Sequence, residues 1–410
     1  MAILKGNAIV GQSGGPTSAI NATLSGVIRG ASFSENISKL YGMKNGIEGF
    51  LGDEIIDLSY LFDDEDKLSL LESTPASALG SCRKKLPNLD TPSDVYSKIF
   101  DLFKKYDIRY FFYIGGNDSM DTVYKLSEYS NHIDYEIRII GVPKTIDNDL
   151  PITDHTPGFG SAAKFIATAI SEIATDCSVY TMNAVTIVEM MGRDAGWLTC
   201  AAALAKEYNG LGADLIYLPE CPFYDNEFIS ALERELEKHP NVVVAVSEGI
   251  RYENGNYVGA SNQSGMVDVF GHKYLAGTAK NLEALVKREI GCKVRSVELN
   301  LLQRCSSHIL SNTDIEESVK IGASAVKLAE SGKSGEMLIF VRKNTECYEV
   351  EISSVPVSMV ANKVKYVPQS FINDEKNNVT KACIEYMSPL VQGERQVKYE
   401  NGIPVHIRLK

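Results

Sequence analysis

The sequence predicts an α/β fold built on open, doubly wound sheets whose strands run largely in parallel. Short runs of valine, isoleucine, leucine and phenylalanine alternate along the chain with stretches of helical periodicity. Because these apolar runs are continuous, the strands are expected to be covered by helices on both faces. Ligands bind such sheets at the carboxyl ends of the strands, so the functional residues are expected where predicted strands end.

The expected elements follow in order from these patterns. Apolar runs predict strands at residues 7–11, 110–116, 137–142, 184–190, 213–219, 241–249 and 336–342. Amphipathic periodicity predicts helices at residues 17–31, 94–106, 159–176, 226–239 and 281–291. Two segments break the alternation: residues 252–280 are polar and rich in glycine, and the tail from about 350 mixes short apolar runs with NDEKNN. No internal repeat and no long linker divides the chain.

The composition is that of a globular protein with an acidic surface. The 410 residues are 44% hydrophobic and 23% charged, with a formal net charge of −12. Nucleic acids and anionic membranes attract clustered lysine and arginine, so neither is expected as a partner. An anionic ligand would need a local basic pocket.

The cysteines and the N-terminus bear on the compartment. Eight cysteines form no CxxC pair and are expected to be buried free thiols in a reducing compartment, and the six histidines show no metal-binding spacing. The N-terminus does not have the pattern of a signal peptide, and no run reaches about 18 apolar residues. A cytoplasmic location is expected.

Two predicted strands end in a Gly-Gly pair that leads into a helix. The first junction contains Gly14 and Gly15; in the second, Gly116 precedes Asn117, Asp118 and Ser119. Glycines let backbone N–H groups approach an anion, and a helix N-terminus adds favourable partial charge. Tight turns and ordinary helix capping are the alternatives. Repeated at two strand ends, the pattern indicates phosphate cradles.

Cationic side chains stand at other predicted turns. Arg83, Lys84 and Lys85 are adjacent, which is typical of a solvated face but also fits an anion clamp. Arg193 follows a strand and a glycine. Arg295 and Arg304 lie nine residues apart around a short apolar run, where they could point at one ligand.

The stretch GVPKTIDNDL (141–150) follows a predicted strand and contains Lys144, Asp147 and Asp149. Taken alone, it is typical of a polar turn. Together with the glycine-bearing strand ends and the arginines, it indicates a phosphoryl-transfer site, which needs positioned cations, a metal and a base near the acceptor hydroxyl. Asp147 is the natural base.

The motifs GGNDS, PKTIDND, MGR, SEG and LLQR occur in this order, and the chain resembles the phosphofructokinases across roughly residues 9–310. The resemblance implies two similar Rossmann-like domains with the active site in the cleft between them. It predicts a phosphoryl-donor domain of residues 1–158 plus 303–353 and a sugar-phosphate domain of residues 159–302 plus 354–410.

Two positions bear on the phosphoryl donor. ATP-using members of this family carry GGDGS and PGTIDND, whereas Asp118 and Lys144 replace the two glycines here, a pair similar to that of pyrophosphate-dependent members. Asp118 would repel the α-phosphate of a nucleotide, and Lys144 would place an ammonium group near pyrophosphate. The implied reaction is a reversible, Mg²⁺-dependent transfer from pyrophosphate to the 1-hydroxyl of fructose 6-phosphate.

The resemblance also assigns roles to residues. Asp147 is the implied base and Asp149 its supporting carboxylate. Donor binding falls to Gly14, Gly15, Arg83, Gly116 and Ser119. Sugar-phosphate binding falls to Thr145, Ile146, Met191, Gly192, Arg193, Glu248, Arg295, Leu301 and Arg304, with Arg295 and Arg304 as the 6-phosphate clamp.

Three positions depart from the family pattern. Asn117 replaces the aspartate that usually holds magnesium, so the metal is expected to be bound with less protein charge. Leu301 stands in place of a histidine or tyrosine. Ala184 stands where many ATP-dependent members carry an arginine that reaches a neighbouring subunit. The family suggests a homodimer or homotetramer.

Three other functions stay open. They are an ATP-dependent phosphofructokinase, a pyrophosphate-dependent kinase of sedoheptulose 7-phosphate, and a catalytically silent regulatory subunit. The first needs an opening at residue 118, and the last is free to lose Asp147, Asp149 and the arginines, all of which are intact.

Overall fold

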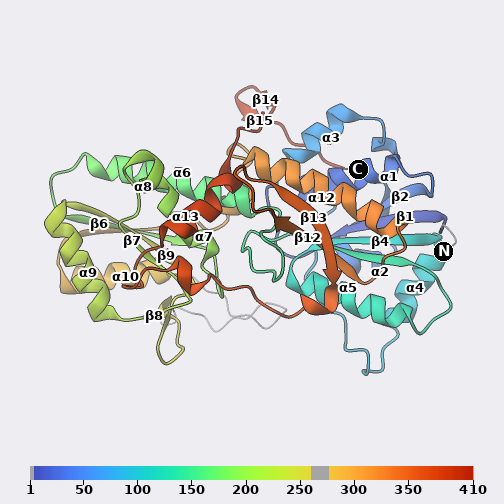
Figure 1. Ribbon diagram of the computed structural model, residues 1–410, viewed down its shortest axis with the longest axis horizontal. Coiled ribbons are helices and arrows are strands. Elements are labelled where there is room, and N and C mark those ends of the chain that lie inside the picture. Colours follow the sequence, from blue (N-terminus) through green and yellow to red (C-terminus); the bar gives the residue numbers. More distant parts are fainter. Residues whose placement is uncertain (1–3, 260–276, 410) are drawn as a thin grey trace.

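The molecule contains two main β-sheets, which lie toward opposite ends of its long axis (Figure 1). The computed structural model describes residues 4–259 and 277–409. Helices cover both faces of each sheet, and most neighbouring strands are parallel. The predicted α/β class with parallel-rich sheets is confirmed.

The larger sheet has seven strands in the order β13-β12-β5-β4-β1-β2-β3. Its inner strands are parallel, and the edge strands β3 and β13 are antiparallel to their neighbours. Their bounds are β1 (Gly6–Gln12), β2 (Ile37–Met43), β3 (Ile55–Asp57), β4 (Ile108–Gly115), β5 (Arg138–Pro143), β12 (Glu336–Arg342) and β13 (Val350–Pro356).

The smaller sheet has four parallel strands in the order β11-β6-β9-β7. Their bounds are β6 (Ala184–Met190), β7 (Leu215–Tyr217), β9 (Asn241–Ser247) and β11 (Lys293–Glu298). Two short pairs complete the strands of the described chain: β8 (Pro222–Phe223) with β10 (Arg251–Tyr252), and β14 (Tyr399–Glu400) with β15 (Ile403–Pro404).

Helices bury one apolar side against each sheet face. On the larger sheet, α1 (Ile20–Ser32) and α12 (Asn312–Glu330) cover one face, and α2 (Gly46–Leu51), α4 (Val95–Lys105) and α5 (Asn117–Ser130) cover the other. Helix α3 (Glu65–Glu72) packs beside α1.

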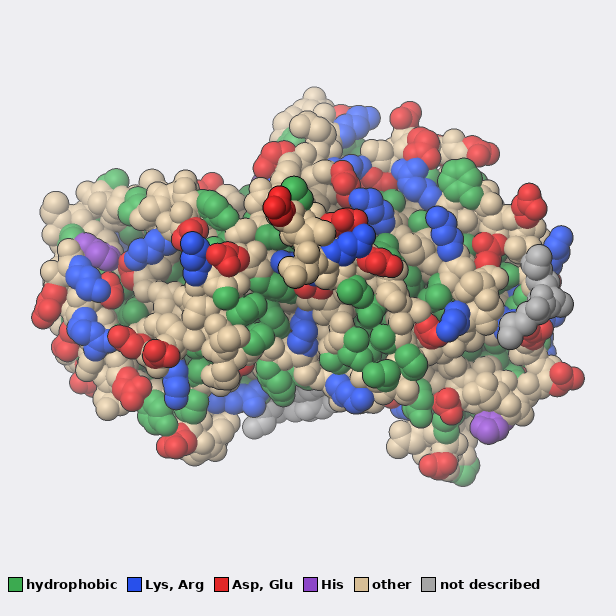
Figure 2. Space-filling view, in the orientation of Figure 1, with side chains coloured by type: hydrophobic (Ala, Val, Ile, Leu, Met, Phe, Trp, Pro, Cys, Tyr) green, Lys and Arg blue, Asp and Glu red, His purple; other side chains and the backbone are tan. Residues whose placement is uncertain are grey.

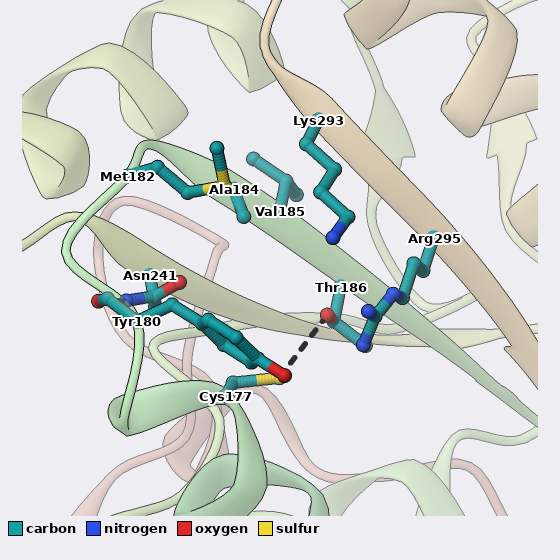
Figure 3. A pocket seen from close by; sticks show the side chains of 9 residues that line it. All are labelled: Cys177, Tyr180, Met182, Ala184, Val185, Thr186, Asn241, Lys293 and Arg295. Atoms are coloured by element: carbon teal, nitrogen blue, oxygen red, sulfur yellow. Dashed lines mark hydrogen bonds between the residues drawn. The ribbon is translucent and has the colours of Figure 1, made fainter.

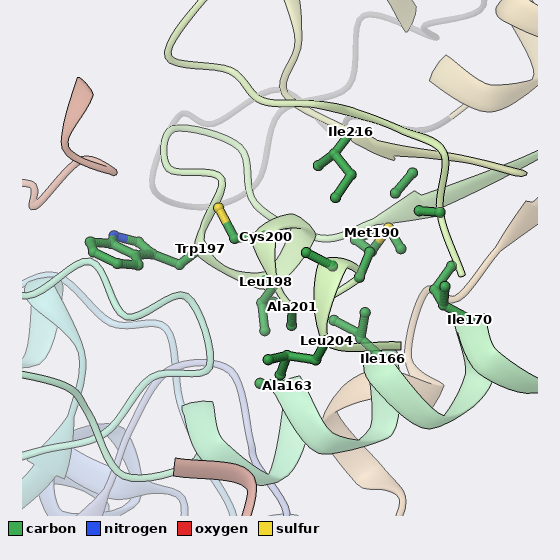
Figure 4. Close-up of a cluster of buried hydrophobic side chains, with 14 of the residues drawn as sticks. Ala163, Ile166, Ile170, Met190, Trp197, Leu198, Cys200, Ala201, Leu204 and Ile216 are labelled. Carbon is green, nitrogen blue, oxygen red and sulfur yellow. The ribbon is translucent and has the colours of Figure 1, made fainter. Parts of the chain in front are cut away.

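On the smaller sheet, α9 (Asp225–Lys238) and α10 (Thr278–Glu289) cover one face. The other face is covered by α6 (Phe159–Ser178), α7 (Trp197–Cys200), α8 (Ala203–Asn209) and α13 (Lys381–Met387). Figure 4 shows Leu198, Ala201 and Leu204 against Ala163 and Ile166 of α6. The last α-helix of the described residues, α11 (Leu302–Cys305), follows β11.

Each of the seven strands predicted from the sequence is present; β6 and β12 have the predicted ends, and the ends of the other five are shifted. The elements that were not predicted include β2, β3, β11 and β13 and helix α12. The burial of β13 alternates along the strand because it is an edge strand with one open face, so it lacks the continuous apolar run that identified the others. The predicted excursion at 252–280 lies largely outside the described residues, and its last residues begin α10.

The chain passes between the two sheets more than once. It leaves the larger sheet after β5, forms the smaller sheet, returns for β12 and β13, and crosses again to α13. Strands β1, β4 and β5 are adjacent, so the loops after them meet at one edge; β6 and β9 likewise bring two loops together. The predicted domain limits at 158, 302 and 353 stay a prediction.

Surface and thiol features bear on the sequence expectations. Acidic and basic side chains are interspersed over the face in Figure 2. Among the described helices, none has both the length and the apolar character needed to cross a bilayer. All eight cysteines are free; Cys305 and Cys347 are exposed and Cys292 is half-buried, while the rest are buried. The expectation of buried thiols therefore holds for five of them.

Candidate active site

A cavity of about 470 Å³ lies where the loops of the two sheets face each other. It is lined by the loops after β1, β4 and β5 of the larger sheet and after β6 and β9 of the smaller one. All the site residues predicted from the sequence line it except Arg295 and Leu301. The basic stretch Arg83, Lys84 and Lys85 lines it too.

Lys144 lies at the end of β5, against the glycine loop after β1. Its Nζ donates a hydrogen bond of 2.6 Å to the carbonyl oxygen of Gly15, and its backbone N–H donates to the carbonyl oxygen of Gly115. Only 2% of the residue is exposed. This burial lowers the pKa of Lys144 to about 8, against the opposing effect of Asp147 and Asp149. The ammonium group therefore loses its proton far more readily than that of an ordinary lysine.

The two aspartates after Lys144 are half-buried in the same cavity. The hydroxyl of Thr145 accepts from the Asp147 N–H at 3.1 Å and donates to its Oδ2 at 3.3 Å. Burial raises the pKa of Asp147. Burial, reinforced by the charge of Asp147, raises the pKa of Asp149 to about 7. A pair of carboxylates with raised pKa values in a cleft is typical of acid–base sites.

The loop after β4 begins helix α5. A side chain at Gly115 would place its Cβ 1.9 Å from Ser119 Oγ, so the turn requires glycine there. Asp118 faces the basic stretch, with 3.8 Å between its Oδ1 and Lys85 Nζ. The loop thus combines a carboxylate with nearby cations on the wall of the cavity.

Asn117 bonds to the backbone of a distant segment. Its Oδ1 accepts from the Asn362 N–H, and its Nδ2 donates to the Lys363 carbonyl oxygen, each at 2.5 Å. An aspartate could not donate the second of these bonds. The amide therefore has a structural reason to stand at this position, separate from the metal-ligand role expected of it.

The loops after β6 and β9 are interlocked. Glu248 Oε1 accepts from the Gly192 N–H at 3.2 Å, and Ser247 Oγ donates to the Gly192 carbonyl oxygen. A Cβ at Gly249 would lie 2.0 Å from the Arg193 carbonyl oxygen, so this close approach requires glycine. Burial raises the pKa of Glu248 to about 7.

Arg304, on α11, reaches the glycine loop. A Cβ built on Gly15 would lie 3.3 Å from its Nη1. Burial and the charge of Arg83 lower its pKa. Arg304, Arg83 and Lys144 therefore gather positive charge on the cavity within an acidic protein, as the sequence requires of a site for an anionic ligand.

Comparison with known proteins identifies the family. The sequence matches the phosphofructokinase family over residues 7–329. The chain belongs to that family.

Two curated relatives resemble this phosphofructokinase over nearly its whole length. The pyrophosphate–fructose 6-phosphate 1-phosphotransferase of Halomonas elongata is 40% identical over 97% of this chain and 94% of its own. The protein of the same name from Methylococcus capsulatus is 38% identical over 98% of this chain and 96% of its own.

The crystal structure of the pyrophosphate-dependent phosphofructokinase from Nitrosospira multiformis superposes with a TM-score of 0.88 and 36% identity. It covers 98% of this chain and 96% of the other.

Two predicted sugar-phosphate residues of this phosphofructokinase lie outside the cavity. Arg295 lies on the edge strand β11 beside Lys293, Tyr180 and Thr186, in a separate small hollow (Figure 3). Its Nη1 lies 4.0 Å from Asp176 Oδ2. Arg295 and Arg304 therefore do not line one cavity within this chain, and the predicted 6-phosphate clamp stays a prediction. The turn at residue 300 (φ 42°) separates the strand that carries one from the helix that carries the other.

Leu301 precedes α11 and is 54% exposed, so it also lies apart from the cavity.

Conversely, the cavity is also lined by four residues that were not singled out in the sequence: Thr17, Asp194, Asn362 and Val364. Thr17 and Asp194 adjoin motifs that were recognised. Asn362 and Val364 lie in a tail segment without a motif, so no local pattern marked them.

Proposed function

We propose that this phosphofructokinase transfers a phosphoryl group from pyrophosphate to the 1-hydroxyl of fructose 6-phosphate. The observation that carries the proposal is the buried ammonium of Lys144, 2.6 Å from the Gly15 carbonyl oxygen and in the same cavity as Asp147. Lys144 places a cation at the glycine loop, and Asp147 places a base on the acceptor side. The relatives from Halomonas elongata and Methylococcus capsulatus carry the name of this reaction.

The chemistry follows from the positions of the side chains. Asp147 takes the proton of the 1-hydroxyl as that oxygen forms a bond to phosphorus, and the bond from phosphorus to the leaving phosphate breaks. Because burial raises the pKa of Asp147, the carboxylate is a stronger base than an exposed aspartate. Lys144 and the arginines of the cavity stabilise the negative charge on the phosphoryl oxygens.

The acceptor is held on the opposite wall of the cavity. Met191, Gly192, Arg193 and Glu248 come from the interlocked loops after β6 and β9. Glu248 can accept a hydrogen bond from a sugar hydroxyl when it is ionised and donate one when it is protonated, since its pKa is raised to about 7. Arg304 supplies positive charge for the sugar phosphate.

Mg²⁺ is the metal we propose for the reaction. The described residues that line the cavity offer carboxylate, amide and hydroxyl oxygens but no histidine or cysteine, a donor set that fits a hard cation. No three of those carboxylates are close enough to form a preassembled cage in the described chain. When bound, the ion would neutralise charge on the phosphate oxygens. Asn117 would hold it at the donor end, with phosphate and water supplying the other ligands.

We also propose a cytoplasmic homodimer or homotetramer. Free thiols at all eight cysteines support a reducing compartment. Beside Arg295, the side chains of Val179, Tyr180 and Met182 are 70%, 45% and 56% exposed, which supports an interface there.

A steady-state assay tests the function. The purified protein is given Mg²⁺ and fructose 6-phosphate with either pyrophosphate or ATP, and sedoheptulose 7-phosphate replaces the sugar in a parallel series. We expect turnover with pyrophosphate and fructose 6-phosphate, and the reverse reaction with phosphate and fructose 1,6-bisphosphate. Turnover with ATP alone would refute the donor, and no turnover with either donor would indicate a silent subunit.

A further inference from the structure

The segment of residues 360–367 joins the two halves of the site. It leaves the end of β13 near α5 and runs back toward α13 (Figure 1). Asn362 and Val364 line the cavity, whereas Lys365 lies behind its wall. Lys365 contributes nothing to the surface that a substrate would touch, yet it contacts the PKTIDND turn.

Lys365 fixes the backbone and the central residue of that turn. Its N–H donates to the Asp149 carbonyl oxygen at 2.7 Å, and its Nζ donates to Asn148 Oδ1 at 3.0 Å. The same ammonium donates to the carbonyl oxygens of Thr153 at 3.2 Å and Asp154 at 2.8 Å. An ammonium group has three donors, so all three are used.

Asn148 needs this support because its backbone is in the left-handed region, with φ 52°. A non-glycine residue in this conformation persists when its surroundings hold it. The Asn148 side chain bonds Lys365 through Oδ1 and the hydroxyl of Tyr386 through Nδ2. Asp147 and Asp149 flank this residue, so the direction of both carboxylates depends on how Asn148 is held.

The other side of Lys365 contacts the acceptor loop. Its carbonyl oxygen accepts from Trp197 Nε1 at 2.9 Å, and its ammonium lies 5.1 Å from the centre of the Trp197 ring. Trp197 begins α7, directly after the MGRDAG loop. One residue thus touches both the turn that carries the base and the element that follows the sugar loop.

The charges around Lys365 come from several elements. Asp149 and Asp154 favour its protonated form, Arg342 of β12 opposes it, and burial lowers its pKa to about 7. In return, the ammonium favours the ionised form of Asp149. Lys365 therefore influences the acidic turn through its charge as well as through hydrogen bonds.

We propose that Lys365 is a positioning residue for phosphoryl transfer, which holds Asn148 so that the Asp147 carboxylate is directed at the acceptor hydroxyl. The proposal rests on the function proposed above. Lys365 touches no substrate, and its effect passes entirely through the turn.

The test compares Lys365→Met, Lys365→Arg and the exposed-surface control Lys381→Met. We expect Lys365→Met to lower kcat by on the order of 100-fold, because small misplacements of a reacting group have effects of this size. The KM values for both substrates should change less than about 2-fold, since no substrate contact is removed. The acidic limb of the pH profile should move to higher pH, because the loss of the cation raises the pKa of Asp149.

Lys365→Arg keeps the charge and should restore the position of the acidic limb, while Lys381→Met should match the wild type. Asn148→Gly gives an independent check, since glycine accepts the left-handed backbone while removing the acceptor for Lys365. It should reproduce the loss in kcat even if Lys365→Met does not fold. Wild-type kcat and an unmoved acidic limb in folded Lys365→Met, or wild-type kcat in Asn148→Gly, would overturn the proposal. An inactive wild type would instead overturn the function on which it rests.

Discussion

At the scale of single residues, Lys144 has the clearest consequence for the pH dependence of the reaction. Its pKa is lowered to about 8 by burial, so its charge is present below that pH and lost as the pH rises through it. We expect kcat/KM with pyrophosphate to fall above about pH 8. A pH series of initial rates measures this limb.

Lys144→Arg tests that assignment, because a guanidinium stays charged to far higher pH. The alkaline limb should move out of the measurable range even if the maximal rate is lower. An alkaline limb that stays near pH 8 in this variant would assign it to another group.

Asp118 has a consequence for the choice of donor. Removing its carboxylate by Asp118→Gly should relieve like-charge repulsion of about 3 kcal/mol toward a nucleotide and raise ATP-supported kcat/KM on the order of 100-fold. Asp118→Asn keeps the size and removes the charge, so it separates repulsion from bulk. The measurement is kcat/KM with ATP and with pyrophosphate. An unchanged donor preference in both variants would contradict the role.

The sequence alone identified those cavity residues that belong to a local backbone motif. Lys144, Asp147 and Gly15 were identified because they stand together after a strand or in a glycine turn, and the structure gathers them in one cavity. The sequence did not indicate that Arg295 lies outside the cavity, because spacing along the chain carries no information about the turn at residue 300. Lys365 was missed because its role depends on contacts with residues distant in sequence.

At the scale of elements, the packing of α1 on α12 sets the position of the glycine loop after β1. A Cβ at Gly26 would lie 2.1 Å from the Val319 carbonyl oxygen, and one at Gly322 would lie 2.2 Å from that of Thr23. The two helices therefore approach so closely that only glycine fits at either contact. Helix α1 begins at Ile20, shortly after the Gly14–Gly15 turn, so its placement constrains that turn.

Gly322→Ala should separate these helices. The added methyl meets backbone rather than a flexible side chain, so the free energy of unfolding should fall by about 1–3 kcal/mol. Urea denaturation followed by circular dichroism measures the change. Ser324→Ala, at a half-buried position of α12, is the matched control and should shift stability by less than about 0.5 kcal/mol. Equal stability of the two variants would mean that the helices adapt.

The elements themselves were predictable in proportion to their burial. Strands such as β4 and β9 are covered on both faces and read as continuous apolar runs, so the sequence identified them. Edge strands such as β13 alternate between packed and open positions and gave no such run. Helix α12 was missed although it has buried positions along its length.

At the scale of the whole molecule, Arg295 raises the question of a shared site. It lies outside the cavity of its own chain, in a hollow that Ala184 also lines. If it serves the sugar phosphate from a second subunit, Arg295→Ala should raise the KM for fructose 6-phosphate. The expected increase is on the order of 10-fold, for the loss of one charge-assisted hydrogen bond.

A mixing experiment identifies which subunit supplies the arginine. Asp147→Asn and Arg295→Ala proteins are dissociated, mixed and reassociated, then assayed at low fructose 6-phosphate. A shared site predicts that the hybrid regains activity that neither parent has, because one of its sites carries both intact residues. Equal rates before and after mixing would show that each Arg295 acts in the active site of its own chain.

The hydrogen bonds between Asn117 and residues 362–363 have a consequence for how the enzyme folds during its synthesis. Domains form from the N-terminus onward as a chain is synthesised. All five recognised motifs have left the ribosome well before the segment that Asn117 and Asp149 bind. A nascent chain that ends near β12 therefore carries every motif of the enzyme but not the segment that fastens its loops. We expect activity to appear only once residue 367 has been added.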